Sequence, residues 1–266
     1  MSGRSNKLSV EEKHLLYEQA VQSVDADIEF IEKEFKNLRK RDPRSLREDF
    51  GGTGYLSCEW VKRHSDNNAW AIDLDPEPVN YGKNRHYKTL NEEQSQRMKY
   101  IMGNVLDNQN FKSDVIVAFN FSYFIFKKRA QLVEYFSKVR EGLKDDGLFF
   151  IDLFGGTECC QEMEEETDHV DFSYFWDCDD YNPITGEVMY YIHFEKGGKK
   201  YEKVFTYDWR MWGLAELRDI LQDAGFSETI AYWEGDDDDG TGDGNFYQAD
   251  NEENCESWVT YIIAKP

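Results

Sequence analysis

Short apolar segments alternate with amphipathic helical stretches between residues 45 and 154, and this alternation limits the possible folds more than any other feature of the chain. A strand, a helix and a second strand in succession require a crossover connection, which makes the two strands parallel. The pattern therefore predicts an α/β fold, doubly wound around a mostly parallel sheet. The predicted strands are residues 45–50, 70–74, 98–106, 114–120 and 148–154, and the predicted helices are residues 55–64, 78–90 and 128–143.

The segments around this core have other periods. Apolar residues recur at helical spacing over residues 10–38, which predicts a helical cap covering residues 1–44 and leaves residues 45–266 as the main domain. Within that domain, a period of two predicts an antiparallel β insert, or lid, over residues 171–212. Its three predicted strands are residues 172–177, 187–194 and 201–209.

The C-terminal part of the chain returns to the pattern of the core. A helix is predicted at residues 214–224, and strands at residues 229–234 and 258–264 complete a sheet of seven. Between these two strands, residues 235–256 are polar and rich in glycine and aspartate, which predicts a mobile loop.

The charge of the chain restricts its partners. With 53 acidic and 31 basic residues, the formal net charge is −22 at pH 7. Such a field repels phosphate backbones and anionic membrane surfaces, so neither a nucleic acid nor a membrane is expected as a partner. It attracts cations and amines, although acidic side chains that only keep the surface soluble remain an alternative.

The cysteines and the N-terminus indicate a cytoplasmic protein. The five cysteines are odd in number, form no CxxC pair and share no local cluster with histidines, which argues against a disulfide framework and against a metal site. Residues 1–10 are polar, and no apolar run reaches the length of a membrane span. We expect a monomer or a homodimer.

A glycine turn follows the first predicted strand. The segment Leu46-Arg47-Glu48-Asp49-Phe50-Gly51-Gly52-Thr53-Gly54 ends a strand and opens a helix. Glycines let the backbone approach a ligand closely, and the first turn of the helix offers unpaired N–H groups. Asp73, at the end of the second predicted strand, can accept hydrogen bonds from both hydroxyls of a ribose. The alternative is an ordinary strand–helix turn beside an exposed acid.

This segment resembles the first motif of the class I S-adenosylmethionine-dependent methyltransferases, in which an acid precedes a glycine-rich turn. Aligned without a gap, Glu48 takes the place of the acid, and Phe50 stands where the family usually has its first glycine. An alignment on Asp49 restores a glycine at Gly51 but omits one residue. The resemblance implies a small-molecule methyltransferase with a Rossmann-like fold and S-adenosylmethionine as its cofactor, which becomes S-adenosylhomocysteine.

The later motifs follow in the order of the family. Ala71-Ile72-Asp73 resembles the second motif and Gly103-Asn104-Val105 the third, where Asn104 replaces an acid that contacts adenine. Residues 114–120 resemble the fourth strand, whose end faces the methyl donor. Arg47 is a candidate for the cofactor's carboxylate, with a surface ion pair as the alternative. Tyr17 could close over the same end, or simply pack on its helix. The resemblance thus implies a cofactor site formed by Tyr17, Arg47, Glu48, Gly51, Gly52, Asp73, Leu74, Asn104, Val105, Asn120 and Phe121.

The acceptor is expected against the ends of the fourth and fifth strands and the insert. Candidate catalytic residues are Tyr123, Asp152, His193 and Tyr207. His193 could act as a general base near neutral pH, although a lone histidine in a hairpin is more often structural. The aromatic side chains of the insert could hold a cationic or aromatic acceptor, or form plain core.

Several functions remain open from the sequence. The first is a methyltransferase for a small-molecule amine or hydroxyl, and the second a methyltransferase for a protein side chain. A third is a non-catalytic cofactor-binding or assembly module, which the departures at Phe50 and Asn104 motivate. A nicotinamide-dependent oxidoreductase is weaker, because the GxGxxG spacing is absent.

Overall fold

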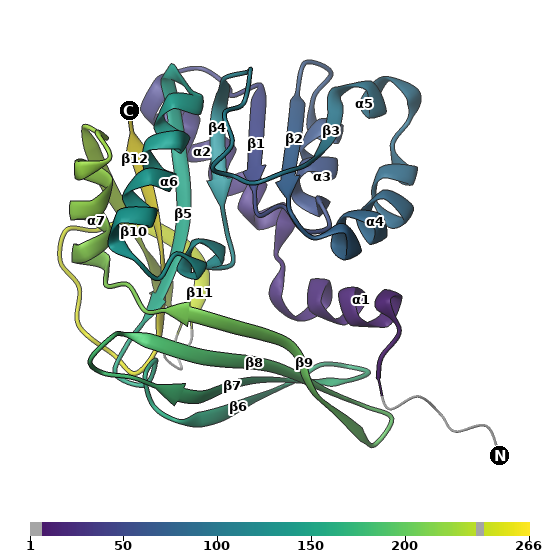
Figure 1. The fold of residues 1–266 in the computed structure, drawn as a ribbon. Coiled ribbons are helices and arrows are strands. Elements are labelled where there is room, and N and C mark those ends of the chain that lie inside the picture. The colour runs from purple at the N-terminus through teal and green to yellow at the C-terminus, as the bar shows by residue number, and fades with distance from the viewer. Residues whose placement is uncertain (1–6, 238–241) are drawn as a thin grey trace.

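The chain forms one large sheet with helices on both faces and a second, smaller sheet across one end, as the computed structural model shows (Figure 1). The structure describes residues 7–237 and 242–266. Within these residues, no helix is both long and apolar enough to cross a bilayer. In spatial order, the main sheet comprises β11 (Gly242–Gln248), β10 (Glu228–Asp236), β12 (Trp258–Lys265), β5 (Leu143–Gly155), β4 (Ser113–Ala118), β1 (Ser45–Asp49), β2 (Asn68–Asp73) and β3 (Met98–Met102).

The predicted doubly wound α/β class is confirmed. β3, β2, β1, β4 and β5 run parallel, and β12 returns antiparallel beside β5. One face packs against α2 (Val24–Arg39) and α3 (Tyr55–Arg63), and the other against α6 (Arg129–Gly142) and α7 (Leu214–Asp223). Because both faces are covered, β1 and β4 are buried along their whole length.

The remaining helices begin at N-cap residues that can be recognised in the sequence. In α1 (Val10–Val21), Ser9 and Glu12 form a capping box. In α4 (Pro76–Arg85), Asp75 accepts the Glu77 N–H, so this helix starts two residues before the predicted one. It is followed by a 3-10 turn, η1 (Tyr87–Thr89), and by α5 (Glu92–Arg97).

The insert has one more strand than predicted. Its antiparallel sheet has the order β6 (Met163–Asp168), β7 (Ser173–Tyr181), β8 (Glu187–Lys196) and β9 (Lys199–Arg210). The sequence of β6, MEEETD, shows no apolar alternation because this edge strand is exposed along most of its length. A charged edge strand of this kind resists pairing with other chains. The boundaries of the cap and insert as separate units stay a prediction.

The main sheet also has eight strands rather than seven. Part of the loop predicted at residues 235–256 is β11, which pairs antiparallel with β10. The strand is polar and mostly exposed, so its formation depends on backbone pairing and leaves no periodic signal. Residues 1–6 and 238–241, which belong to the predicted polar N-terminus and to this loop, lie outside the described residues.

A buried carboxylate joins the starts of β1 and β4. Asp114 accepts hydrogen bonds from the backbone N–H groups of Arg44 and Ser45 and from the Ser45 hydroxyl, all within 2.9 Å. Arg41 and Lys144 form ion pairs with it at 2.7 and 3.1 Å. Burial alone would raise the pKa of Asp114, but these donors lower it to about 2.

We expect Asp114→Ala to lower the free energy of unfolding by about 3 kcal/mol at pH 7, because two backbone N–H groups lose their buried partner. The carboxylate is more acidic in the folded chain than in the unfolded one, where its pKa is about 3.9. Its contribution is therefore complete above about pH 4 and disappears as the pH falls through about 2. Urea unfolding at pH 7 and in acid measures both effects.

Asp146→Ala is the matched control, since Asp146 binds the same Arg41 side chain at the surface. This exposed pair should contribute less than about 1 kcal/mol. Equal losses in the two variants would contradict the role assigned to Asp114.

Candidate functional site

A cavity of about 210 Å³ lies where the carboxyl ends of β1 and β4 meet α1, α2 and β9. In open α/β sheets, ligands bind at this edge, where the loops of neighbouring strands diverge. Figure 1 shows α1 and the small sheet lying across this end of the main sheet. The wall of the cavity includes Lys13, His14, Tyr17, Gln22, Asp27, Glu48, Phe50, Gly51, Gly52, Thr53, Asn120, Ser122, Phe205 and Tyr207.

The glycine turn after β1 forms one side of this cavity. Gly52 and Gly54 have φ angles of +52° and +64°, which glycine adopts without strain. Phe50 has a φ of +54°, a conformation that is unusual for a bulky side chain. Phe50 thus occupies a position that favours glycine, which supports the alignment without a gap and Glu48 as the acid of the motif.

Asp73 holds the turn in place. Its Oδ2 accepts the Gly52 N–H at 2.7 Å, and its Oδ1 accepts the Asp75 N–H at the same distance. Each carboxylate oxygen has a second lone pair, so Asp73 can still accept hydrogen bonds from a ligand. The neighbouring Leu74 is 65% exposed and therefore free to cover a ligand at this edge.

Two further acids, Glu48 on β1 and Asp27 on α2, line the cavity. Burial raises the pKa of Glu48 to about 7, although Ser57 donates two hydrogen bonds to its Oε2. Burial likewise raises the pKa of Asp27 to about 6, against the effect of the Tyr261 hydroxyl at 2.7 Å. Neither carboxylate forms an ion pair with a cation in the part of the chain that the structure describes, so a positive charge in the cavity would favour their ionised forms.

Asp152 shapes the turn at the end of β4. Its two oxygens accept the consecutive N–H groups of Asn120 and Phe121 at 2.6 and 2.9 Å. These two residues have φ angles of +55° and +56°, so the carboxylate stabilises a strained turn. Burial raises the pKa of Asp152 to about 7, although the two N–H groups lower it.

The cap helix α1 closes the cavity from the opposite side. Tyr17 packs against Phe205 of β9 with 4.8 Å between ring centroids, and its hydroxyl is hydrogen-bonded to Tyr207. Burial raises the pKa of Tyr17 to about 12, and the charge of Asp152 acts in the same direction. The structure thus brings Tyr17 and Tyr207 to one wall, with Asp152 close enough to act on Tyr17 electrostatically.

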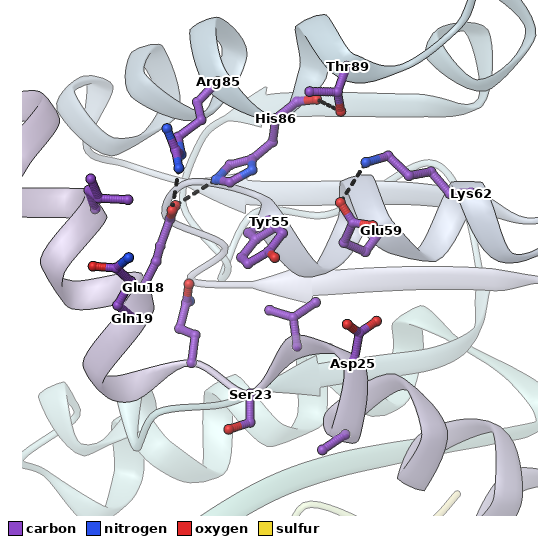
Figure 2. A pocket seen from close by; sticks show the side chains of 14 residues that line it. Glu18, Gln19, Ser23, Asp25, Tyr55, Glu59, Lys62, Arg85, His86 and Thr89 are labelled. Carbon is purple, nitrogen blue, oxygen red and sulfur yellow. Dashed lines mark hydrogen bonds and ion pairs between the residues drawn. The ribbon is translucent and has the colours of Figure 1, made fainter. Parts of the chain in front are cut away.

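A second hollow, of about 750 Å³, lies between the end of α1, the start of α2, α3 and the end of α4 (Figure 2). Its charged side chains largely pair with each other. Glu18 of α1 lies 2.6 Å from His86 Nε2, and Lys62 lies 2.6 Å from Glu59. The Tyr55 ring stacks on His86 with 4.2 Å between centroids. This hollow contains neither the glycine turn nor Asp73, and its contacts attach α1 to α4.

The structure places Arg47, the predicted partner of a ligand carboxylate, outside the lining of this cavity. Arg47 is 2% exposed and forms a bidentate ion pair with Asp49, at 2.7 and 2.9 Å. Its guanidinium also donates to the Val105 carbonyl, and Asp49 accepts the Tyr135 hydroxyl. Successive residues of β1 point to opposite faces, so Arg47 faces α6 while Glu48 faces α3. Arg47 therefore stabilises the sheet from the far side.

Two of the predicted catalytic residues also lie away from the cavity. Tyr123 is fully buried, and its hydroxyl donates to the Asp152 carbonyl at 2.7 Å. His193 is on the outer face of the insert, where its Nε2 lies 3.0 Å from Asp177 and 3.6 Å from Glu164. The Lys203 N–H donates to Nδ1 at 2.6 Å, so the proton of the neutral ring must be on Nε2. That proton leaves Nε2 no lone pair for a metal, although the three side chains cluster closely.

The predicted adenine-side residues lie next to one another after β3. Asn104 Oδ1 accepts a hydrogen bond from the Leu106 N–H at 3.0 Å, so this side chain stabilises the turn that follows β3. Val105 is 4% exposed and packs into the core. No contact tests their role toward a ligand, and it stays a prediction.

Sequence reasoning missed Lys13, His14 and Asp27, which the structure adds to the cavity. Lys13 binds Glu77 at 2.8 Å and lies 4.7 Å from the centroid of the Phe205 ring. Burial lowers the pKa of His14, with Lys13 adding to this effect. His14 precedes Tyr17 by three residues on one helix, so helical spacing places both on the same face. From this spacing, the sequence could have predicted His14 beside Tyr17 in the cavity.

Two buried atoms of the cavity wall lack a partner. Gln22 Oε1 and Thr53 Oγ1 are inaccessible to solvent and make no hydrogen bond to residues 7–237 or 242–266. Buried polar atoms are rarely left unpaired in folded proteins, and exceptions are common where a ligand binds. Together with Glu48 and Asp27, which form no ion pair with a described cation, these atoms indicate a polar ligand that carries hydrogen-bond donors and positive charge.

The backbone strain at Phe50 can be measured with two variants. Phe50→Ala and Phe50→Gly lose the same ring contacts to Phe126 and Tyr135, so both should be less stable than the wild type. Only glycine relieves the positive φ, so Phe50→Gly should be more stable than Phe50→Ala by about 1 kcal/mol. Urea unfolding of both proteins provides the comparison. The reverse order would show that Phe50 does not occupy a glycine position.

Solved structures share this architecture at low sequence identity. A scan with family models and a search of curated proteins find no match. An S-adenosylmethionine-dependent methyltransferase from Clostridium acetobutylicum superimposes with a TM-score of 0.70 at 18% identity, over 95% of this chain and 97% of that one. The amino pentose methyltransferase CalS10 from Micromonospora echinaspora gives 0.64 at 10% identity, over 99% and 100%. The sugar N-methyltransferase KedS8 from a Streptoalloteichus species gives 0.61 at 14% identity, over 98% and 95%. The chain therefore shares the fold of these methyltransferase structures over nearly its whole length.

Proposed function

We propose that this protein is an S-adenosylmethionine-dependent methyltransferase that acts on a small-molecule amine. The observation that carries the proposal is the cavity at the carboxyl edge of β1 and β4. It combines a glycine turn held by Asp73 with two acids, the buried Glu48 and the half-buried Asp27, that form no ion pair with a described cation. The likeness to methyltransferase structures over nearly the whole chain supports the same assignment.

The residues of the cavity fit the cofactor. Asp73 would accept hydrogen bonds from the ribose, and Leu74 would cover the adenine next to Asn104 and Val105. Glu48 and Asp27 would face the positive charges of the cofactor, an ammonium and a sulfonium. The bound cofactor supplies an activated methyl group whose leaving group, a neutral thioether, needs no acid catalysis. One related structure contains this cofactor, according to its description.

An amine fits the acceptor side of the cavity. Tyr17, Tyr207 and Ser122 offer hydroxyl groups that can orient a polar acceptor, and Phe205 adds an aromatic wall. A neutral amine attacks a methyl carbon without a strong base, so the protein must mainly align the two groups and exclude water. Two of the similar structures are described as a sugar N-methyltransferase and an amino pentose methyltransferase, which supports an amino sugar or a similar amine.

Isothermal titration with S-adenosylmethionine tests the cofactor. We expect micromolar binding by the wild type and at least ten-fold weaker binding by Asp73→Ala, because the carboxylate that accepts hydrogen bonds from the ribose is removed. Asp66→Ala is the control, since this aspartate is exposed and remote from the cavity. Absence of heat with the wild type would overturn the proposal. Labelled methyl groups that become acid-precipitable in a cell extract would instead indicate a protein acceptor.

Lys13 takes the place predicted for Arg47 toward the cofactor's carboxylate. It is the lysine that lines the cavity, and Glu77 positions its ammonium group. The wild type should bind S-adenosylmethionine at least ten-fold more tightly than its decarboxylated analogue, because only the former has a carboxylate to pair. Lys13→Met should remove this preference, whereas Lys36→Met, at an exposed position, should keep it. An unchanged preference in Lys13→Met would rule out this role.

A further inference from the structure

Two adjacent cysteines lie in the connection between β5 and β6, and neither lines the proposed methyl-transfer cavity. Cys159 and Cys160 are free thiols, both half-buried, and their sulfurs are 3.7 Å apart. The sequence makes the two residues neighbours but does not decide whether their side chains face each other. In the structure they do, so each sulfur can reach the other with little rearrangement.

The loop that carries the pair is attached to two other parts of the chain. The Thr157 N–H donates to the Cys255 carbonyl at 3.1 Å, which joins the loop to the segment before β12. The Tyr190 hydroxyl of β8 donates to the Cys159 carbonyl. These contacts hold the backbone on which the two thiols meet.

The two thiols have different surroundings. Cys159 Sγ donates to the Gly156 carbonyl at 3.1 Å, a contact that stabilises a thiol and would repel a thiolate. The Cys160 sulfur instead accepts a hydrogen bond from the Tyr181 hydroxyl. The contact with Cys159 and the hydrogen bond from Tyr181 lower the pKa of Cys160 to about 7, against the effect of burial. At neutral pH, Cys160 therefore supplies the thiolate of the pair, and Cys159 keeps its proton.

We propose that Cys159 and Cys160 form a reversible oxidation site for hydroperoxides, in which Cys160 reacts first and Cys159 then closes a disulfide. The Cys160 thiolate attacks one oxygen of the peroxide, the O–O bond breaks, and the leaving oxygen takes up a proton as water or an alcohol. The Cys159 sulfur then attacks the sulfenic sulfur of Cys160. An S–S bond replaces the S–O bond, and hydroxide leaves with the Cys159 proton as water. The two electrons that the pair loses reduce the peroxide.

A disulfide between neighbouring residues is easily reduced again. Consecutive Cα atoms are about 3.8 Å apart, whereas disulfides usually join Cα atoms at least about 4.4 Å apart. Strained disulfides have the higher reduction potentials of labile bonds, so small thiols can open this one. Ring closure also turns the Cys159–Cys160 peptide bond, whose carbonyl accepts the Tyr190 hydroxyl. The site does not depend on the proposed methyl transfer.

Treatment of the reduced protein with one equivalent of hydrogen peroxide at pH 7 tests the site. By mass spectrometry, we expect the peptide that contains Cys159 and Cys160 to become lighter by about 2 Da, the mass of two hydrogen atoms. Dithiothreitol should restore its mass. Before oxidation, Cys160 should react with iodoacetamide at least ten-fold faster than Cys255, which is exposed but donates its thiol to the Ser257 carbonyl.

Two variants separate the roles of the pair. Cys159→Ser should stop the reaction at the sulfenic acid of Cys160, which dimedone labels, whereas Cys160→Ser should give neither the disulfide nor the label. Cys255→Ser is the matched control and should form the disulfide like the wild type, because its side chain is outside the pair. The wild-type measurements need no variant to fold. A pair that stays reduced in the wild type, or oxidation of Cys255 ahead of the pair, would overturn the proposal.

Discussion

The site depends on two carboxylates, the half-buried Asp73 and the buried Asp152, that accept hydrogen bonds from backbone N–H groups at the carboxyl edge of the sheet. Asp73 binds the turn after β1, and Asp152 binds the turn after β4. Both turns contain residues with positive φ, which the chain adopts only where other contacts compensate the strain. Without these hydrogen bonds, removing each carboxylate from water would cost free energy. Without its carboxylate, each strained turn would relax. Together they keep the two loops apart and the cavity open between them.

The same arrangement explains why the cavity suits a cation. Burial raises the pKa of Glu48 to about 7 and that of Asp27 to about 6, and neither carboxylate forms an ion pair with a cation among the described residues. A positively charged ligand in the cavity would lower the pKa of both carboxyl groups, because it stabilises their ionised forms. The formal net charge of −22 acts in the same direction over longer distances. Glu48 and Asp27 thus favour a cationic ligand, which the net negative charge of the chain also attracts.

The insert has two faces with different roles because its strands alternate. Tyr207 and Phe205 point toward α1 and complete the cavity, whereas His193 points outward to Asp177. A register shift between Ile192 and Phe194 accompanies the positive φ of Lys203, whose N–H reaches the imidazole. A bulge of this type redirects a side chain without ending the strand. The histidine therefore fixes the shape of the insert and lies outside the cavity.

The sequence alone determined the α/β class, the order of the core strands and helices, the glycine turn and the position of Asp73 at its end. These features follow from local rules, namely hydrophobic period, helix caps and the φ angles that glycine permits. Only the tertiary structure decided where Arg47 points. Because β1 is buried on both faces, its sequence pattern does not indicate which face lies toward the ligand. Only the tertiary structure paired the polar strand β11 with β10, and added Lys13, His14 and Asp27 to the cavity. Those outcomes arise from contacts between segments far apart in the chain, and no local period encodes which distant segment a side chain will meet.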